Sequence, residues 1–306
     1  MQKSELNEVF LATMHDSTGP SAHANATSGM LVAASTDGVN FRNVSDNNES
    51  LYSPVNGVRD PSVIYWQGQW FMVYNYGPSI EPIVFLLKSS DLLHWEPLGS
   101  LRLAPTVPDV GYHPNGINIP QWIVDKEGNI HIFGNLSNNQ HSVEIHPLSA
   151  DPSTWGDQDN WSAVTTVTDN NGEPLVLGNA FVALRNGTYY MVFNEVDVSF
   201  SKYYMRTSTD LISWSESRLL EIDNSGFGDT SESQNIMFLS DGTLRFYISA
   251  SNAERNMIWH VDSTDLGVTW ESPELLTFSG FAPKNINWAH IARITDPDAL
   301  KQIANN

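Results

Sequence analysis

The sequence predicts an all-β protein, a five-bladed β-propeller whose ring is closed by pairing of the N- and C-terminal strands. Two periodic signals lead to this prediction. A seven-residue tag, Ser-x-Asp-x-x-x-(Trp/Phe), occurs four times, and a fifth copy, Ser263 to Trp270, carries one extra residue. The tags begin at Ser35, Ser89, Ser149, Ser208 and Ser263. Successive tags begin 54 to 60 residues apart, a period that suits one four-stranded propeller blade.

A turn glycine forms the second signal, 21 residues before the serine of each later tag, at Gly68, Gly128, Gly187 and Gly242. The surrounding sequences, such as Arg185-Asn-Gly-Thr188, are typical of hairpin turns, where Gly, Asn or Asp accepts a positive φ. Aromatic and aliphatic runs of strand length flank each glycine, for example Ser62 to Tyr65 and Trp70 to Tyr74. Each repeat therefore predicts an inner strand, a glycine turn, a second and a third strand, the tag and an outer strand.

The two ends of the chain are each expected to supply part of the fifth blade. The first tag lacks the upstream glycine hairpin, and the C-terminal run Asn285 to Arg293 has no tag after it. Pairing of this run with strands near Val9 to Met14 and Gly29 to Ala34 would complete the blade and leave no long sheet edge exposed. A closed propeller is one unit, so residues 1–306 are predicted to form a single catalytic domain.

Composition narrows the classes of partner and function. The chain has 15 Lys plus Arg against 35 Asp plus Glu, a formal net charge of −20, which argues against nucleic acid or an anionic membrane and favours a neutral ligand. The alternative is that the acidic balance serves only solubility. No apolar stretch approaches the length of about 18 residues that a membrane helix needs. Met1 to Glu5 lacks the apolar core of a signal peptide. We expect a soluble protein, cytoplasmic or exported with its signal peptide removed. The absence of cysteine excludes disulfides and thiol catalysis.

Candidate site residues follow from the propeller geometry, because the inner strands of all blades converge on a central channel. Eight residues before the turn glycines stand Asp60, Pro120, Asn179 and Gln234, and ten before stand Val58, Asn118, Leu177 and Glu232. Residues two apart on a strand share a face, so both rows line one channel unless a bulge intervenes. Asp60 and Glu232, from different blades, are predicted to face one cavity. The alternative is structural, with Asp60 paired to Arg59 at a strand start and Glu232 as a solvated strand start.

The chain resembles glycoside hydrolase family 43 and its five-bladed relatives over nearly its whole length. The motifs that carry the resemblance are Arg59-Asp-Pro-Ser62, Ile119-Pro-Gln-Trp122, and Ser231-Glu232 followed by Ser240-Asp-Gly-Thr243. The resemblance implies that Asp60 is the general base and Glu232 the general acid of an inverting glycosidase. Such enzymes hold two carboxyl groups about 6.5 to 9.5 Å apart, with room for a water between them. Glu232 must then hold a proton near neutral pH while Asp60 stays ionised.

The substrate implied by the resemblance is a terminal pentoside, an α-L-arabinofuranoside or β-D-xyloside, in oligosaccharides derived from plant or algal polysaccharides. One departure is the position of the usual third carboxylate, which modulates the acid and here is Asn179. An amide supplies no charge. Either Glu195 or Asp197 substitutes, the site works without the charge, or the chain is an inactive relative. The last case keeps a non-catalytic carbohydrate-binding propeller as the alternative function.

Other residues are predicted to bind the sugar through hydrogen bonds or stacking. They are Arg59, His113, Asn118, Gln121, Trp122, Trp288 and His290. For the amides, pairing with the backbone at strand ends is the alternative. His290 is expected on the fifth inner strand, and by resemblance a histidine beneath the sugar site holds water or a metal; a hydrogen-bonded structural histidine is the alternative. No cluster has zinc spacing, so no metal or cofactor is expected to be required, with a structural channel cation near His290 left open.

A sialidase is the competing enzyme class, because Ser263 to Trp270 matches the Asp-box pattern of that family in full. The Asp box stabilises a turn and takes no part in catalysis. Sialidases have six blades and an arginine trio that grips a carboxylate, whereas this chain predicts five blades and has nine scattered arginines. The sequence therefore favours the five-bladed glycosidase.

Overall fold

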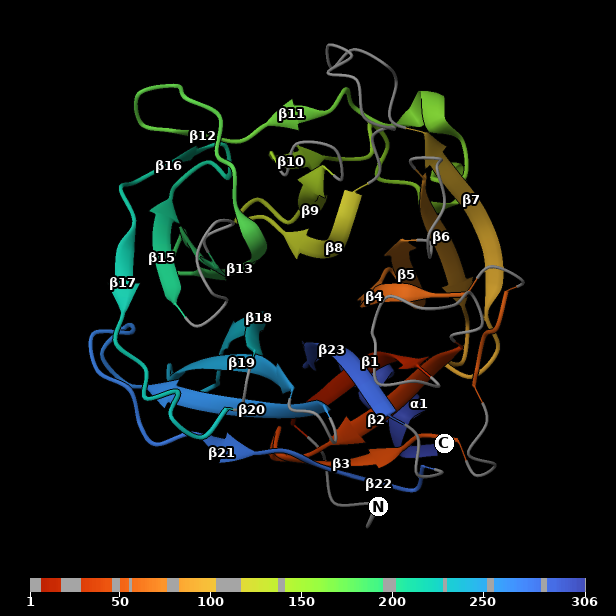
Figure 1. Ribbon diagram of the computed structural model, residues 1–306. Helices are drawn as coiled ribbons and strands as arrows, with labels where there is room; N and C mark the ends of the chain where they lie inside the picture. The colour runs from red at the N-terminus through yellow and green to blue at the C-terminus, as the bar shows by residue number, and fades with distance from the viewer. Residues whose placement is uncertain are drawn as a thin grey trace.

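The computed structural model describes residues 7–17, 29–45, 50–54, 57–75, 83–102, 117–136, 141–194, 202–227, 230–251, 256–281 and 285–305. Figure 1 shows their strands as a ring of sheets arranged around a common axis. Five sheets of four or five strands form the blades of an all-β, five-bladed propeller, which confirms the predicted fold class. The count of five also excludes the six-bladed sialidase architecture.

Blades one to four each run from an inner to an outer strand. Blade one contains β4 (Arg59–Trp66), β5 (Gln69–Asn75), β6 (Ile83–Ser89) and β7 (Glu96–Arg102). Blade two contains β8 (Ile117–Val124), β9 (Ile130–Leu136), β10 (Ser142–Ile145) and β11 (Thr165–Thr166). Blade three contains β13 (Gly178–Arg185), β14 (Thr188–Asn194), β15 (Tyr203–Ser208) and β17 (Arg218–Leu220). Blade four contains β18 (Thr230–Phe238), β19 (Leu244–Ser251), β20 (Asn256–Ser263) and β21 (Glu274–Leu275).

Blade five joins the two ends of the chain, as the sequence predicts. Its sheet has the order β23 (Asn285–Ile294), β1 (Val9–Ser17), β2 (Met30–Ser35), β3 (Asn40–Asn43) and β22 (Thr277–Ser279). The C-terminal β23 is the inner strand and pairs with β1 in antiparallel register, with Thr13 opposite His290. This pairing closes the ring, so that the N- and C-terminal strands share one sheet (Figure 1).

Shorter elements complete the fold. A small parallel pair, β12 (Thr168–Asp169) and β16 (Ser213–Trp214), links blades two and three, and two 3₁₀ turns cover Pro152–Thr154 and Gln158–Asn160. The helix α1 (Pro297–Asn305) packs its apolar face, with Leu300 and Ile303, on the core between blades five and one. Within the described residues, no helix has the length and apolar character needed to cross a membrane.

The tags form hydrogen-bonded turns between the third and outer strands. In the second tag, the Ser89 hydroxyl donates to Asp91 Oδ1 at 3.2 Å, and the same carboxylate oxygen accepts the N–H groups of Leu93 and His94 at 3.0 and 2.8 Å. The tags at Ser35, Ser208 and Ser263 repeat this serine-to-aspartate bond at 2.7 to 3.0 Å. The turn places its fourth residue in the left-handed region, as at Leu92 with φ 71°. These bonds make the tags fold elements with no catalytic part.

The core lies between the faces of neighbouring blades and consists of five separate apolar clusters. The tag tryptophans fill it: Trp155 lies in the cluster between blades one and two, and Trp214 in the cluster between blades two and three, both at most 1% exposed. The indole N–H of Trp214 donates to the Leu211 carbonyl at 2.9 Å, which pairs the polar atom within the apolar site. Each tag therefore fixes one blade against the next.

Candidate functional site

The inner strands carry a β-bulge near their start, at the end of the channel where the candidate acids lie. In β4, β8 and β13 the pairing register shifts around a left-handed residue, namely Asp60, Ile119 and Asn179, with φ of 48°, 54° and 40°. In β18 the shift lies between Ser233 and Asn235. A bulge with a positive φ re-aims side chains away from the regular alternation of a strand. The simple rule that residues two apart share a face therefore fails at these positions.

The pairing register of the strands shows which residues of different blades are equivalent, and it corrects the alignment obtained by counting back from the turn glycine. The residues seven positions after the glycines are Asn75, Asn135, Asn194 and Ser249, and they pair with Arg59, Asn118, Gly178 and Glu232. Blades two and four have a five-residue hairpin loop where blades one and three have two residues. The longer loop adds two residues before the glycine and one after it, so the register shifts by one position relative to the glycine. The equivalent of Asp60 in blade two is therefore Ile119, and the prediction that Pro120 occupies this place was wrong.

Asp60 is a buried carboxylate, 7% exposed, at the bulge of β4. Its Oδ2 accepts a hydrogen bond from the Asn75 amide at 3.0 Å, and the same amide nitrogen lies 3.3 Å from Asn118 Oδ1 on the neighbouring inner strand. The other oxygen, Oδ1, is buried and has no partner among the described residues. The hydrogen-bond partner of the Asp60 carboxylate is thus Asn75. The alternative structural role predicted from the sequence paired Asp60 with Arg59 instead. Arg59 is half-buried, and its Nε also lacks a partner within the described part of the chain.

The other predicted residues of this end are only partly described. Asn118 is exposed beside Asn75, and Asn179 is half-buried at the bulge position that matches Asp60. Glu232 and Trp288 lie in β18 and β23, but their side chains fall outside the described residues. His113, Glu195 and Asp197 lie outside the described residues altogether.

A polar belt crosses the channel one level further along the inner strands. The register places the polar Ser62, Gln121 and Asn235 and the aromatic Phe181 at equivalent positions of blades one to four. His290 of blade five lies at the same level, beside Ser62. Inner strands are the edge strands of their sheets, so their channel-facing N–H and C=O groups need partners from elsewhere. The belt supplies these partners from neighbouring blades.

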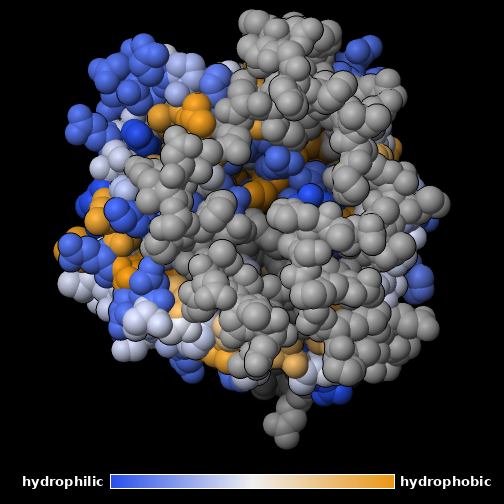
Figure 2. Space-filling view, viewed as in Figure 1, coloured by the Kyte–Doolittle hydropathy of each residue, from blue (hydrophilic) through white to orange (hydrophobic). Residues whose placement is uncertain are grey.

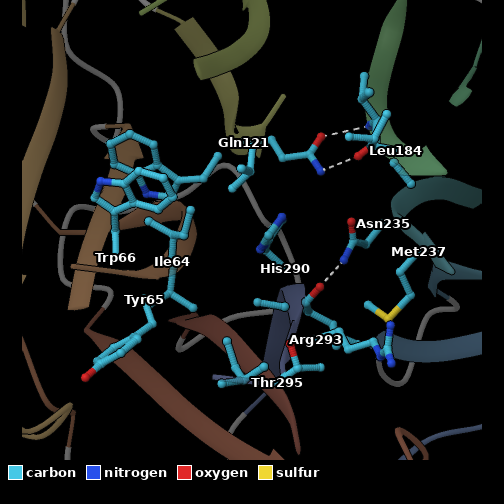
Figure 3. Close-up of a pocket in the computed structure, with 18 of the residues that line it drawn as sticks. Ile64, Tyr65, Trp66, Gln121, Leu184, Asn235, Met237, His290, Arg293 and Thr295 are labelled. Carbon is cyan, nitrogen blue, oxygen red and sulfur yellow. Dashed lines mark hydrogen bonds between the residues drawn. The ribbon is translucent and has the colours of Figure 1, made fainter. Parts of the chain in front are cut away.

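Gln121 shows how the belt works. Its amide nitrogen donates to the Val182 carbonyl at 2.9 Å, and its amide oxygen accepts the Val182 N–H at 2.8 Å (Figure 3). Asn235 donates in the same way to the Ile291 carbonyl on β23, and Ser62 Oγ accepts the Trp122 N–H at 3.2 Å. Gln121 therefore bridges β8 and β13, which is the backbone-pairing alternative to sugar binding.

Two aromatic candidates also have packing roles. Trp122 is 6% exposed, and its ring packs at a tilt against Trp155 and Trp161 of the core between blades one and two, at centroid distances of 5.8 and 6.5 Å. His290 lies on the fifth inner strand, as predicted, with Nε2 3.4 Å from Ser62 Oγ and Nδ1 buried without a partner among the described residues. Burial lowers the pKa of His290 to about 3, so its imidazole is neutral near pH 7.

A cavity of about 660 Å³ opens on the far side of the belt from Asp60. It is lined by residues of all five inner strands, among them Gln121 and His290 (Figure 3). Among its described lining residues, Asp296 is the only carboxylate. The bulged end, by contrast, holds the buried Asp60 carboxylate. In Figure 2 the described surface near the centre of the ring combines hydrophilic and hydrophobic residues.

Comparisons with known proteins identify the fold. No protein-family model matches the sequence, and no curated protein matches it significantly. Solved structures do match, at low identity. A GH43 β-1,3-galactosidase solved with galactodeoxynojirimycin aligns with a TM-score of 0.60 and 13% identity over 88% of this chain and 90% of that chain. An α-L-arabinanase from Cellvibrio cellulosa, complexed with arabinohexaose, aligns at 0.53 and 15% over 86% and 91%.

A third match is the exo-β-1,3-galactanase from Clostridium thermocellum, with a TM-score of 0.61 and 15% identity over 88% of this chain. This chain spans 59% of that protein's length. The structural neighbours are five-bladed propeller glycosidases of the GH43 and GH62 groups. At these identities the likeness confirms a shared glycosidase fold, and the neighbours include both galactosidases and arabinanases.

Proposed function

We propose that the protein is an inverting glycoside hydrolase whose active site lies at the bulged end of the channel. The observation that carries the proposal is the Asp60 carboxylate, which is buried, held through Oδ2 by Asn75, and without a described partner on Oδ1. Burying a carboxylate with an unused oxygen costs free energy, so such a group calls for a functional explanation. A fixed oxygen with free lone pairs is suited to accept a proton from water, as a general base does.

Glu232 is the proposed general acid. Support comes from the strand register, in which Glu232 of β18 is equivalent to Arg59, the residue next to Asp60. In the reaction, Asp60 takes a proton from a water, and the water oxygen attacks the anomeric carbon. The bond from that carbon to the leaving oxygen breaks on the opposite face, and Glu232 transfers its proton to that oxygen. Water attack from the opposite face inverts the anomeric configuration.

Three polar residues are proposed to hold the sugar. Arg59 has a buried Nε without a described partner, a donor that can bind a sugar oxygen beside the base. Asn118 lies next to Asn75 and presents its exposed amide at the same end. Asn179 takes the bulge position of β13, the inner strand of blade three. Its neutral amide positions groups through hydrogen bonds, and the charged groups of the proposed site are Asp60 and Glu232.

The proposed substrate is a neutral oligosaccharide with a terminal pentosyl or galactosyl residue. The resemblance to glycoside hydrolase family 43 favours a terminal α-L-arabinofuranoside or β-D-xyloside. The names of the structural neighbours include a β-1,3-galactosidase, an exo-β-1,3-galactanase and an α-L-arabinanase, so β-1,3-linked galactosides are candidate substrates as well as arabinosides. The net charge of −20 agrees with an uncharged ligand rather than an anionic one.

The test is hydrolysis of a panel of aryl glycosides and natural disaccharides that covers these three sugars. Asp60→Asn should lower kcat on the best substrate by about 10²- to 10⁴-fold, the usual contribution of a general base. Glu232→Gln should slow a natural disaccharide far more than an aryl glycoside, whose good leaving group needs no proton. Glu127→Gln, at a carboxylate whose side chain is 59% exposed on a hairpin loop, is the matched control and should leave turnover unchanged.

Stereochemistry gives an independent check of the mechanism. An NMR time course of the parent protein should show the inverted anomer first, and first appearance of the retained anomer would rule out the proposed roles.

Asn179 in place of an acid favours a second candidate, a carbohydrate-binding propeller without turnover. Binding of these sugars without hydrolysis of any member of the panel would establish that candidate and end the enzyme proposal.

A further inference from the structure

A cluster of two histidines and a buried glutamate lies in blade two, away from the channel residues. Glu144 and His146 are two residues apart at the end of β10, and His131 is near the start of β9. The two strands pair in antiparallel register, with Ile145 opposite Ile132, and Figure 1 shows them side by side. Side chains two apart on a strand share a face. The hairpin therefore brings all three side chains together on one face of the blade.

The distances within the cluster are short. Glu144 Oε1 lies 2.6 Å from His131 Nδ1 and 2.8 Å from His146 Nδ1. Each residue offers one ligand atom, and the three ligand atoms all lie within 4.8 Å of one another. The Glu144 side chain is 4% exposed, the His131 side chain 14%, and the His146 side chain 40%. The cluster thus has a buried carboxylate at its base and one side open to solvent.

A fourth residue supports His131 from behind. Its other ring nitrogen, Nε2, lies 3.1 Å from Asp125 Oδ2, a carboxylate on the β8–β9 loop whose side chain is 10% exposed. A metal-ligating histidine typically donates its second N–H to a carboxylate, which fixes the ring and raises its basicity as a ligand. Asp125 gives His131 this arrangement, with Nδ1 directed at the cluster.

We propose that His131, Glu144 and His146 form a binding site for a divalent transition-metal ion, with Zn²⁺ as the best match. Two imidazole nitrogens and one carboxylate oxygen are ordinary zinc ligands. A water on the solvent side, next to the exposed His146, completes a tetrahedral shell. The ligands belong to the second and third strands of blade two, not to the inner strand β8, so a bound ion ties β9 to β10.

The state without metal also follows from the contacts. His131 faces a carboxylate through each ring nitrogen, Glu144 at Nδ1 and Asp125 at Nε2. A metal ion at Nδ1 replaces the direct contact between His131 and Glu144 and is held by both side chains. A purely structural ion pair, His131 with its two carboxylates, predicts no specific metal binding.

Isothermal titration of the full chain with ZnCl₂, after dialysis against EDTA, tests the proposal. We expect one ion per chain and a rise in Tm on saturation. His146→Ala removes the accessible ligand and should weaken zinc binding at least tenfold. Asp125→Asn leaves every ligand in place and should still cost about 10- to 100-fold in affinity.

The control is His94→Ala, which removes a histidine that also pairs with an aspartate, Asp91, at 2.8 Å but belongs to no three-ligand cluster of the described residues. Its zinc affinity should equal that of the parent protein. Far-UV circular dichroism of each variant verifies that the fold is retained. No binding by the parent protein, or equal affinity in the parent and in folded His146→Ala, would overturn the proposal and leave the ion-pair explanation. Neither outcome depends on glycoside hydrolysis.

Discussion

Gln121 offers a sharp test of how the open edges of the inner strands are satisfied. Its amide makes two buried hydrogen bonds to one residue of the next blade, to the Val182 carbonyl and from the Val182 N–H. Gln121→Leu keeps the approximate volume of the side chain and removes both bonds. Each buried backbone group left without a partner costs about 1 to 3 kcal/mol, so the variant should lose about 2 to 6 kcal/mol of unfolding free energy.

The assay is urea or guanidinium denaturation followed by tryptophan fluorescence, with midpoint and slope compared between variant and parent. Gln69→Leu, at an exposed position of β5, is the matched control and should stay within about 0.5 kcal/mol of the parent. A loss below about 1 kcal/mol for Gln121→Leu would show that water or another group satisfies Val182 equally well. A selective rise in KM without loss of stability would restore the alternative that Gln121 binds sugar.

Three further predictions concern the turns and the core. Burial alone would raise the pKa of Asp91, but the N–H bonds from its tag outweigh burial and lower it to about 2. The folded pKa is below the unfolded value of about 3.9, so this stabilisation is present above about pH 4 and is lost as the pH falls towards 2. Denaturation at a series of pH values should therefore show a smaller acid-induced loss in Asp91→Asn; parallel curves would contradict it. Gly156→Ala should lower Tm, because its Cβ would lie 2.3 Å from the Leu98 carbonyl oxygen. Gly226→Ala meets no atom of the described residues within 4 Å and should be neutral; equal Tm values for the two variants would refute the clash. Trp214→Ala, at a fully buried tag position, should cost about 3 to 5 kcal/mol in denaturant unfolding, and a loss under about 1 kcal/mol would remove it from the core.

Most of the fold was predictable because its signals are local and repeated. The tag turn depends on serine and aspartate side chains that bond to the backbone within a few residues, as in Ser89 and Asp91. The hairpins depend on a glycine with positive φ, such as Gly68 with φ 85°. A period that recurs along the chain then determines how many blades there are, and the leftover strands at the two ends can pair only with each other.

The candidate site was predictable only in part, because counting along the chain assumes equal hairpins and straight strands. The longer loops of blades two and four shifted the count, so that Ile119 took the place expected for Pro120. Bulges at Asp60 and Asn179 re-aimed side chains in a way that no short motif announces. Gln121 was expected at a sugar, yet its partner is a backbone segment 61 residues away.

The amino-acid sequence by itself determined the propeller, its five blades, the closure of the ring and the position of Asp60 on an inner strand. Turn chemistry and strand periodicity act over a few residues, so they can be read without knowing what lies across the molecule. Tertiary structure alone decided which residues share one level of the channel. It also assembled His131, Glu144 and His146, whose spacing matches no zinc motif, because strand register brings together side chains that are distant in sequence.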